Sequence, residues 1–158
     1  MKILITGGAG FIGSALIRQL VANSTHEIIN VDCLTYASSY ASLASVAKSP
    51  RYHFEKIDIC DLQALSRAIA NHRPDGIIHL AAESHVDRSI ANPESFIQTN
   101  VVGTYRLLSA AYEYYASLTG AKRRCFKFHH VSTDEVYGPR LQRDTWVAED
   151  ASYAPSSP

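Results

Sequence analysis

The sequence predicts an α/β protein whose core is a doubly wound parallel sheet. Short apolar segments that suit strands alternate with helix-like segments, which is typical of parallel strand–helix–strand units. The strand-like segments are short and apolar, as expected where helices cover both faces of a sheet. A length of 158 residues is enough for one domain with a substantial core. We therefore expect a single domain over residues 1–158.

The first half of the chain contains three of the expected strands. The apolar run Lys2–Thr6 predicts the first strand and Phe11–Ala22 the helix after it. Glu27–Val31 predicts the second strand. Residues 33–50 are rich in Ser, Ala and Tyr and predict a loop with one helical stretch. Tyr52–Ile57 predicts the third strand.

A capped helix precedes the fourth strand. The Asp61 carboxylate can accept the first-turn N–H groups of a helix over Leu62–His72. The apolar segment Gly76–Leu80 then predicts the fourth strand.

A long helix and a fifth strand complete the pattern. The helix is expected over Ser95–Leu118, entered through Pro93, with Gly120 as its C-terminal cap. Phe126–Ser132 predicts the fifth strand, and the pattern fades from Gly138 onward. Since sheets of this type commonly have six or more strands, we expect a sheet truncated after its fifth strand in part of a longer protein.

Composition narrows the classes of function. Lys plus Arg and Asp plus Glu number 15 each, and this neutral balance argues against a nucleic-acid or membrane-surface binder. No signal peptide or membrane-spanning stretch is evident. Three scattered cysteines, Cys33, Cys60 and Cys125, favour a reducing, cytoplasmic setting. No metal site is expected, because the sequence lacks a Cys/His cluster and the side chains of the adjacent His129 and His130 alternate across a strand.

A glycine-rich turn follows the first strand. Gly7, Gly10 and Gly13 have the spacing G-x-x-G-x-x-G and lead directly into a helix. Such glycines permit a tight turn and close approach of a pyrophosphate to the helix N-terminus. A merely flexible turn is the alternative, but the strand before it and the helix after it favour a dinucleotide-binding Rossmann fold.

An acidic residue supports this interpretation. Asp32 ends the second strand, where a carboxylate can accept hydrogen bonds from ribose hydroxyls and would repel a 2′-phosphate. No Lys or Arg lies between Asp32 and Ala47. NAD is therefore predicted rather than NADP. Asp32 as a simple strand-end turn residue is the alternative.

Two polar clusters follow the fourth and fifth strands. Residues 81–89 read A-A-E-S-H-V-D-R-S and residues 132–138 read S-T-D-E-V-Y-G. Both lie where ligands bind in such sheets, at the carboxyl ends of the strands. Adjacent Asp134 and Glu135 suit an acid and a base, although a solvated loop is the alternative. For His85 we favour a supporting hydrogen bond over metal ligation or a general-base role.

The long helix has apolar and aromatic residues at helical spacing. We expect them to pack in the core, with an interface as the alternative. They are Tyr105, Leu108, Tyr112 and Tyr115.

With these residues in view, the whole chain resembles the extended short-chain dehydrogenase/reductase superfamily, and within it the dTDP-glucose 4,6-dehydratases. The glycine turn from Thr6 to Gly13 is shared by several branches. More specific are D-C-L-T-Y at residues 32–36, A-A-E-S-H-V-D-R-S-I at 81–90, S-T-D-E-V-Y-G at 132–138 and S-Y-A-P-S-S-P at 152–158.

The resemblance implies a role for individual residues. Thr133 would bond the sugar O4, Asp134 would be the general acid and Glu135 the general base. Ser84, Thr133 and Asp134 would bind the substrate. The implied NAD-binding residues are Gly7, Gly10, Phe11, Ile12, Gly13, Asp32, Cys33, Leu34, Thr35, Asp58, Ile59, Leu80, Ala81, Ala82, Glu83, Ser84 and Thr99.

The implied reaction converts dTDP-glucose into a 4-keto-6-deoxy sugar nucleotide for deoxysugar biosynthesis. It proceeds by oxidation at C4, loss of water across C5 and C6, and return of the hydride. The resemblance also implies a homodimer of the full-length protein, built on paired helices.

Two departures from the family pattern stand out. Ser38-Ser39 occupies the place of the usual Gly-Asn, and the family's Tyr-x-x-x-Lys pair and nucleotide-binding C-terminal region lie beyond Pro158. We therefore expect residues 1–158 alone to lack turnover.

Other functions stay open at this point. They are a nucleotide-sugar 4-epimerase, a UDP-glucuronate decarboxylase, and a non-catalytic NAD-binding protein on the same fold. The adjacent acid and base favour the dehydratase, because neither rival enzyme has to expel a C6 hydroxyl.

Overall fold

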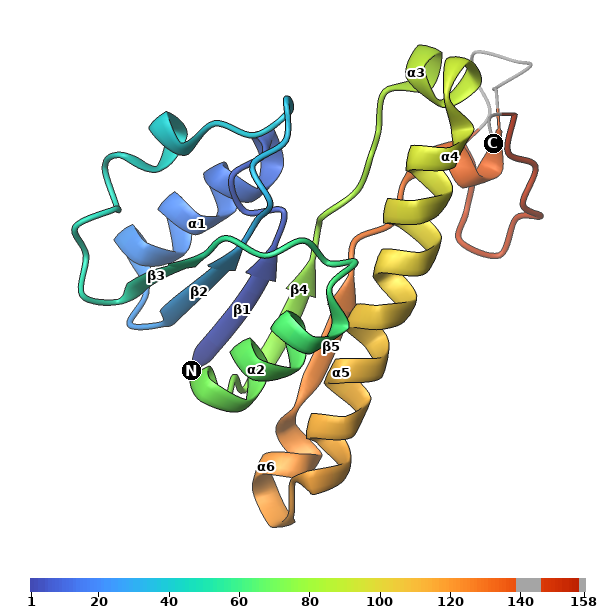
Figure 1. The fold of residues 1–158 in the computed structure, drawn as a ribbon. Coiled ribbons are helices and arrows are strands. Elements are labelled where there is room, and N and C mark those ends of the chain that lie inside the picture. Colours follow the sequence, from blue (N-terminus) through green and yellow to red (C-terminus); the bar gives the residue numbers. More distant parts are fainter. Residues whose placement is uncertain (139–145, 157–158) are drawn as a thin grey trace.

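Five parallel strands form the centre of the molecule (Figure 1). The computed structural model describes residues 1–138 and 146–156. The strands lie in the spatial order β3-β2-β1-β4-β5, and every neighbouring pair is parallel, which confirms the predicted sheet. Their bounds are Lys2–Thr6 (β1), Glu27–Val31 (β2), Tyr52–Glu55 (β3), Gly76–His79 (β4) and Lys127–His130 (β5).

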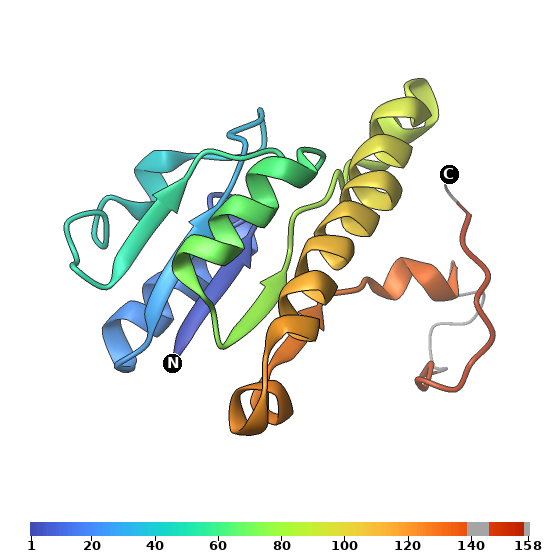
Figure 2. The same ribbon diagram turned by 60° about the horizontal axis from the view of Figure 1, so that its bottom comes forward.

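Helices lie on both faces of this sheet. Figure 2 shows α2 and α5 side by side on one face, with α1 behind the strands. The α-helices are Phe11–Asn23 (α1), Leu62–His72 (α2), Val86–Ala91 (α3), Pro93–Phe96 (α4), Thr104–Ser117 (α5) and Gly120–Cys125 (α6). Tyr40–Leu43 (η1) and Asp134–Tyr137 (η3) are 3₁₀ turns, and Ile97–Gly103 (η2) is π-helical. No helix in the described ranges is both long and apolar enough to cross a membrane.

The alternation of side chains along each strand builds two cores. Leu4 and Ile29 belong to the cluster that packs beneath α2 and α5. Their neighbours Ile5 and Ile28 belong to the cluster beneath α1 and η1. All four are completely buried. The period of two therefore fixes which face each strand residue covers.

β1 and β2 have the predicted bounds, whereas β3, β4 and β5 end before their predicted carboxyl ends. Pairing stops where Val31 meets Glu55 and where His79 meets His130. One further backbone hydrogen bond follows at Leu80 N and at Val131 N, and the predicted extensions to Ile57, Leu80 and Ser132 are loops.

The predicted long helix is one continuous rod made of three segments. It begins at Pro93, passes through the π-helical segment η2 and ends at Ser117. The short helix α3 precedes this rod and was not predicted from the sequence. Gly120 is not the C-terminal cap. Leu118 ends α5 in an extended conformation, and Gly120, with φ of 56°, is the first residue of α6.

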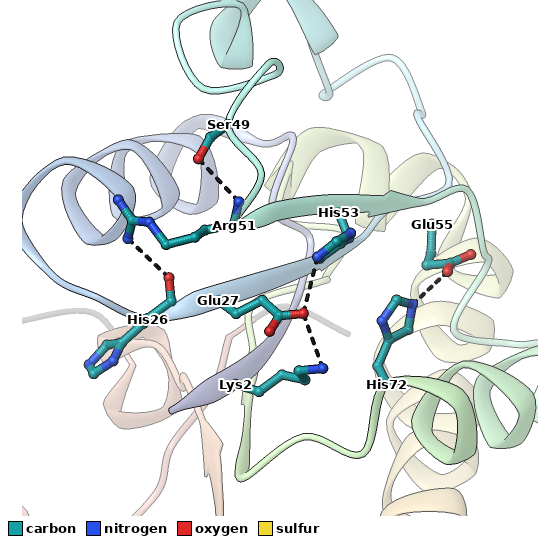
Figure 3. Close-up of polar contacts among 8 residues, drawn as sticks. All are labelled: Lys2, His26, Glu27, Ser49, Arg51, His53, Glu55 and His72. Carbon is teal, nitrogen blue, oxygen red and sulfur yellow. Dashed lines mark hydrogen bonds and ion pairs between the residues drawn. The ribbon is translucent and has the colours of Figure 1, made fainter.

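Charged side chains line the amino ends of β1 and β2 (Figure 3). Glu27 lies 3.0 Å from Lys2 Nζ and 3.1 Å from His53 Nε2, and the hydrogen bond from Lys2 lowers the pKa of Glu27. His72 Nε2 lies 2.7 Å from Glu55. Because most of these side chains are more than 30% exposed, each pair contributes less than about 1 kcal/mol.

Arg51 lies directly before β3 and contacts the segment that precedes β2 (Figure 3 shows its contact with His26). Its guanidinium donates to the carbonyl oxygens of Val21 at 2.7 Å, Ser24 at 2.6 Å and His26 at 3.2 Å. These carbonyls belong to the end of α1 and the turn after it, where backbone acceptors lack helical partners. Arg51 therefore ties the end of α1 to the edge strand.

We predict that Arg51→Met lowers the free energy of unfolding by about 1–3 kcal/mol, because partly buried carbonyls lose a charged donor. Urea unfolding followed by circular dichroism measures the change. Arg18→Met is the matched control, since within the described ranges Arg18 donates to a single carbonyl oxygen, that of Ser42, on the surface. Equal effects of the two substitutions would contradict the role given to Arg51.

Candidate functional site

The loops at the carboxyl ends of the strands line one continuous cleft of about 1090 Å³. Every predicted cofactor or catalytic residue except Leu34 lines it. The glycine turn, the loops after β2, β3 and β4, and the turn η3 all contribute. The predicted residues along the cleft are Gly7, Gly10, Phe11, Ile12, Gly13, Asp32, Cys33, Thr35, Asp58, Ile59, Leu80, Ala81, Ala82, Glu83, Ser84, Thr99, Thr133, Asp134 and Glu135.

The three motif glycines have different structural roles. Gly7 has φ of 70°, and a Cβ there would come within 2.6 Å of the Ala81 nitrogen. A Cβ at Gly13 would overlap the carbonyl of Gly7. At Gly10 the same oxygen lies 3.3 Å away and is the one neighbour within 4 Å in the described structure. Gly7 and Gly13 therefore permit backbone packing, whereas Gly10 keeps the floor of the cleft open.

The N-terminus of α1 faces this floor. Within the described residues, no side chain caps the helix at Gly10. The side chains of Phe11 and Ile12 are 93% and 63% exposed, so they do not cover the helix end. First-turn N–H groups and the positive end of the helix dipole are therefore available to an anion.

Asp32 joins two loops of the cleft. Its carboxylate is 5% exposed and accepts hydrogen bonds from Ala9 N at 2.9 Å, Leu34 N at 2.8 Å and Ser38 Oγ at 2.9 Å. Ser38 occupies the place of the family's usual glycine, so its hydroxyl is an added donor. A carboxylate offers about four acceptor positions, and Asp32 keeps acceptor capacity on the cleft side.

Leu34 differs from its predicted role. Its side chain packs against the core cluster that contains Ile5 and Ile17 and does not line the cleft. Its φ of 60° is unusual for a side chain of this size and costs energy locally. This conformation lets the Leu34 N–H reach Asp32.

The loop after β3 closes one end of the cleft. Asp58 accepts from Cys60 N at 2.8 Å, which shapes the turn. Ile59 is 4% exposed and packs against η2, where a Cβ at Gly103 would lie 2.8 Å from it.

Burial raises the pKa of the Cys33 thiol, and the charge of Asp58 adds to this effect.

The loop after β4 is held by a residue that the sequence analysis missed. Asn100 Oδ1 accepts from Glu83 N at 2.8 Å, and Asn100 Nδ2 donates to Glu83 O at 2.9 Å. An asparagine within a helical pattern was the available signal, because Asn favours contacts with backbone groups outside the helix.

A buried histidine beneath the cleft was also missed. His79 is 1% exposed, and its ring nitrogens lie 2.6 Å from Thr6 Oγ1 and 3.0 Å from Thr104 Oγ1. Thr6 Oγ1 also accepts from Ala81 N. Burial lowers the pKa of His79 to about 4, and the nearby His130 contributes. A histidine inside an apolar strand was the signal for this network.

Of the predicted catalytic residues, Thr133 is the N-cap of η3 and Asp134 and Glu135 are its first two residues, in the segment that follows β5. Thr133 Oγ1 accepts from Glu135 N at 3.2 Å, so the Thr133 hydroxyl hydrogen is free to point elsewhere. Asp134 and Glu135 line the cleft and are exposed among the described residues. Two carboxyl groups and a hydroxyl group thus line the same cavity as the glycine turn.

Other predicted features lie outside the cleft. His85 precedes α3 and does not line it. Tyr105, Leu108 and Tyr112 are 68%, 45% and 70% exposed, so core packing is wrong for them. Within residues 1–138 and 146–156, no group of three His, Cys, Asp or Glu side chains could hold a metal ion. Of the 152–158 motif, residues 157 and 158 lie outside the described residues.

Comparison with known proteins points to one family. The GDP-mannose 4,6-dehydratase family model matches residues 4–158. The chain is 54% identical to a dTDP-glucose 4,6-dehydratase from Shigella flexneri, covering 100% of this chain and 46% of that protein. It is 55% identical to the protein of the same name from Neisseria meningitidis serogroup B, covering 99% and 44%. The chain thus spans about half the length of these relatives.

Solved structures share this architecture. The dTDP-glucose 4,6-dehydratase DesIV from Streptomyces venezuelae, determined with NAD bound, has a TM-score of 0.85 at 43% identity over 99% of this chain and 46% of its own. The NAD complex of a UDP-glucose 4-epimerase from Thermus thermophilus has a TM-score of 0.83 at 27% identity over 99% and 45%. This chain therefore shares its fold with both the dehydratase and the epimerase, but its sequence is more similar to that of the dehydratase.

The pKa of His79 predicts a pH dependence of stability. In the unfolded chain a histidine has a pKa of about 6.5, whereas in the folded protein the pKa of His79 is about 4. Between these two pH values the unfolded chain therefore binds a proton that the folded protein does not. Stability is therefore fully present above pH 6.5 and falls by about 3 kcal/mol as the pH drops to 4. Urea unfolding between pH 7 and 4 measures this.

His79→Gln provides the comparison for this pH series. The variant should be less stable at pH 7, because its contacts with Thr6 and Thr104 are altered, but its stability should fall less steeply between pH 6.5 and 4. Identical slopes for both proteins would show that His79 does not contribute.

Proposed function

Because this chain belongs to the GDP-mannose 4,6-dehydratase family, we propose that it forms the NAD-binding part of a dTDP-glucose 4,6-dehydratase, a lyase. The observation that supports this most directly is the shared cleft. The glycine turn, Asp32 and the adjacent Asp134 and Glu135 all line one cavity. In this proposal residues 1–158 form a Rossmann domain, and the nucleotide part of the sugar substrate binds to a region outside them.

The described residues fit NAD. A pyrophosphate suits the open floor at Gly10 and the uncapped end of α1. Asp32 would accept a ribose hydroxyl, and its charge would disfavour a 2′-phosphate. When bound, NAD would supply the redox chemistry that converts the sugar C4 alcohol to a ketone and later reduces C6.

Thr133 and the first two residues of η3 would carry out the elimination. The Thr133 hydroxyl, with its hydrogen free, would donate to the sugar O4. The ketone at C4 acidifies the neighbouring C5 proton, which the Glu135 carboxylate would remove. Asp134 would donate a proton to the leaving C6 hydroxyl, so that water departs. An epimerase or a decarboxylase does not need to protonate a leaving C6 hydroxyl.

The exposed face of the long rod supports a homodimer of the full-length protein. Exposed apolar side chains recur there every three or four residues, on one side of η2 and α5. A second copy of the rod could cover this stripe. Its members are Ile97, Val101, Tyr105, Leu108 and Tyr112.

A cytoplasmic location is part of the same proposal. Cys33, Cys60 and Cys125 are all unpaired in the structure, as a reducing compartment would favour.

We predict that the product of the complete open reading frame converts dTDP-glucose, rather than UDP-glucose, into a 4-keto product. Glu135→Gln should lower kcat by about 10²–10⁴-fold, because the C5 proton loses its base. Glu94→Gln, on the exposed first turn of α4, is the matched control. Unchanged turnover in Glu135→Gln would contradict the role of Glu135 as the base. Formation of the 4-keto product by residues 1–158 alone would contradict the proposal that a region outside these residues is needed for turnover.

Glycine substitutions test the cofactor site separately from the fold. Gly10→Ala should preserve folding but weaken NAD binding by about tenfold or more, because the methyl group enters the cleft floor. Gly13→Ala should destabilise the protein itself, since its Cβ overlaps the Gly7 carbonyl. Calorimetric NAD titration and thermal unfolding distinguish the two. Equal NAD affinity in Gly10→Ala and the unchanged protein would exclude a pyrophosphate at this position.

A further inference from the structure

The order of the strands places two loops on either side of the glycine turn. β1 lies between β2 and β4 in the sheet, so the loops after β2 and β4 flank the turn that follows β1. Both loops line the cleft. A side-chain contact between these two loops therefore joins the two sides of the cleft next to the glycine turn, where a dinucleotide would lie.

Tyr36 makes such a contact. Its hydroxyl donates to Glu83 Oε2 at 3.1 Å, and the guanidinium carbon of Arg88 lies 3.7 Å from the centre of its ring. One loop residue is thus held at its hydroxyl by a carboxylate and on its face by a cation. Tyr36 is 58% exposed, which places this contact at the solvent side of the loops. We refer to Tyr36, Glu83 and Arg88 as the loop bridge.

Both ends of the loop bridge are anchored in the structure. Glu83 is fixed through its backbone by the two hydrogen bonds to Asn100. Two residues after Tyr36, Ser38 is bonded to the buried Asp32. These anchors already restrict the two loops, so the side chains have less conformational entropy to lose when they make contact. The bridge therefore costs less conformational entropy than an isolated pair on the surface.

The loop bridge also divides two cavities. A second cavity of about 400 Å³ lies between the loop after β2 and the helices α3 and α4. Thr35, Glu83 and Phe96 line both this cavity and the larger cleft. Tyr36 and Arg88 line the smaller cavity but not the larger cleft. The bridge therefore lies at the boundary of the cleft rather than on its floor.

We propose that the loop bridge retains NAD on the protein by closing the adenosine half of the cleft between the loops after β2 and β4. This inference rests on the proposed function. A reaction that returns NAD to its starting form in each cycle needs no exchange of the cofactor, so slow release does not limit turnover. For NAD to leave past this side, Tyr36 must separate from Glu83 and Arg88.

The experiment measures the release of NAD from the product of the complete open reading frame. The protein is loaded with radiolabelled NAD, freed of excess by rapid gel filtration and chased with unlabelled NAD. Tyr36→Phe, which removes the hydroxyl alone, should release NAD about fivefold faster. Tyr36→Ala should release it about tenfold faster or more, because contact with Arg88 is lost as well. The association rate constant should rise as well, because NAD that enters past this side must also separate Tyr36 from Glu83 and Arg88.

Two further variants make the test specific. Tyr40→Phe is the matched control, because Tyr40 packs against Phe54 and does not line the cleft, and its release rate should equal that of the unchanged protein. Glu83→Ala should accelerate release, and the double variant with Tyr36→Phe should be no faster than the faster single variant, since both remove the same hydrogen bond.

The outcomes separate the two proposals. If the unchanged protein fails to bind NAD, the proposed function is contradicted. If NAD binds normally and Tyr36→Ala or Tyr36→Phe releases it at the unchanged rate, the bridge is overturned while the proposed function stands. Fully additive effects of Tyr36→Phe and Glu83→Ala would also overturn it. Circular dichroism of each variant identifies any loss of fold, and Tyr36→Phe, which changes one exposed hydroxyl, then decides the result.

Discussion

The buried carboxylate of Asp32 links the parts that shape the cleft. Through Ala9 it holds the glycine turn, and through Leu34 and Ser38 it holds the loop after β2. A charge at 5% exposure is stable only when hydrogen bonds replace its water. The need to satisfy this carboxylate therefore fixes two loops relative to each other, and the positive φ of Leu34 is a local cost of that arrangement.

A second buried network lies beneath the cleft, between the strand that leads into the glycine turn and the strand that leads toward η3. His79 contacts Thr6 at the end of β1 and Thr104 at the start of α5, and its ring lies 5.1 Å from that of His130. His130 is only two residues from the S-T-D-E-V-Y-G segment. The buried histidine therefore packs against the end of the strand that leads toward η3.

The amino and carboxyl ends of the strands have different structural roles. At the amino ends, exposed ion pairs such as Lys2–Glu27 add little stability, and Arg51 secures the end of α1. At the carboxyl ends, backbone groups and a few buried polar side chains leave an open cleft. Because polar groups are concentrated where the strands end, the rigid sheet positions side chains such as Asp32 and Glu135 along one cleft.

The sequence by itself determined the five strands, α2 with its Asp61 cap and the spacing of the glycine turn, because these depend on local periodicity and on backbone capping. It also placed the polar clusters at one sheet edge, since parallel strands end together. Only the tertiary structure decided that His79 and Asn100 support the cleft, that Leu34 turns into the core, and that Tyr36 reaches Glu83. Those contacts join residues 17 to 73 positions apart or depend on burial, so no local pattern encodes them.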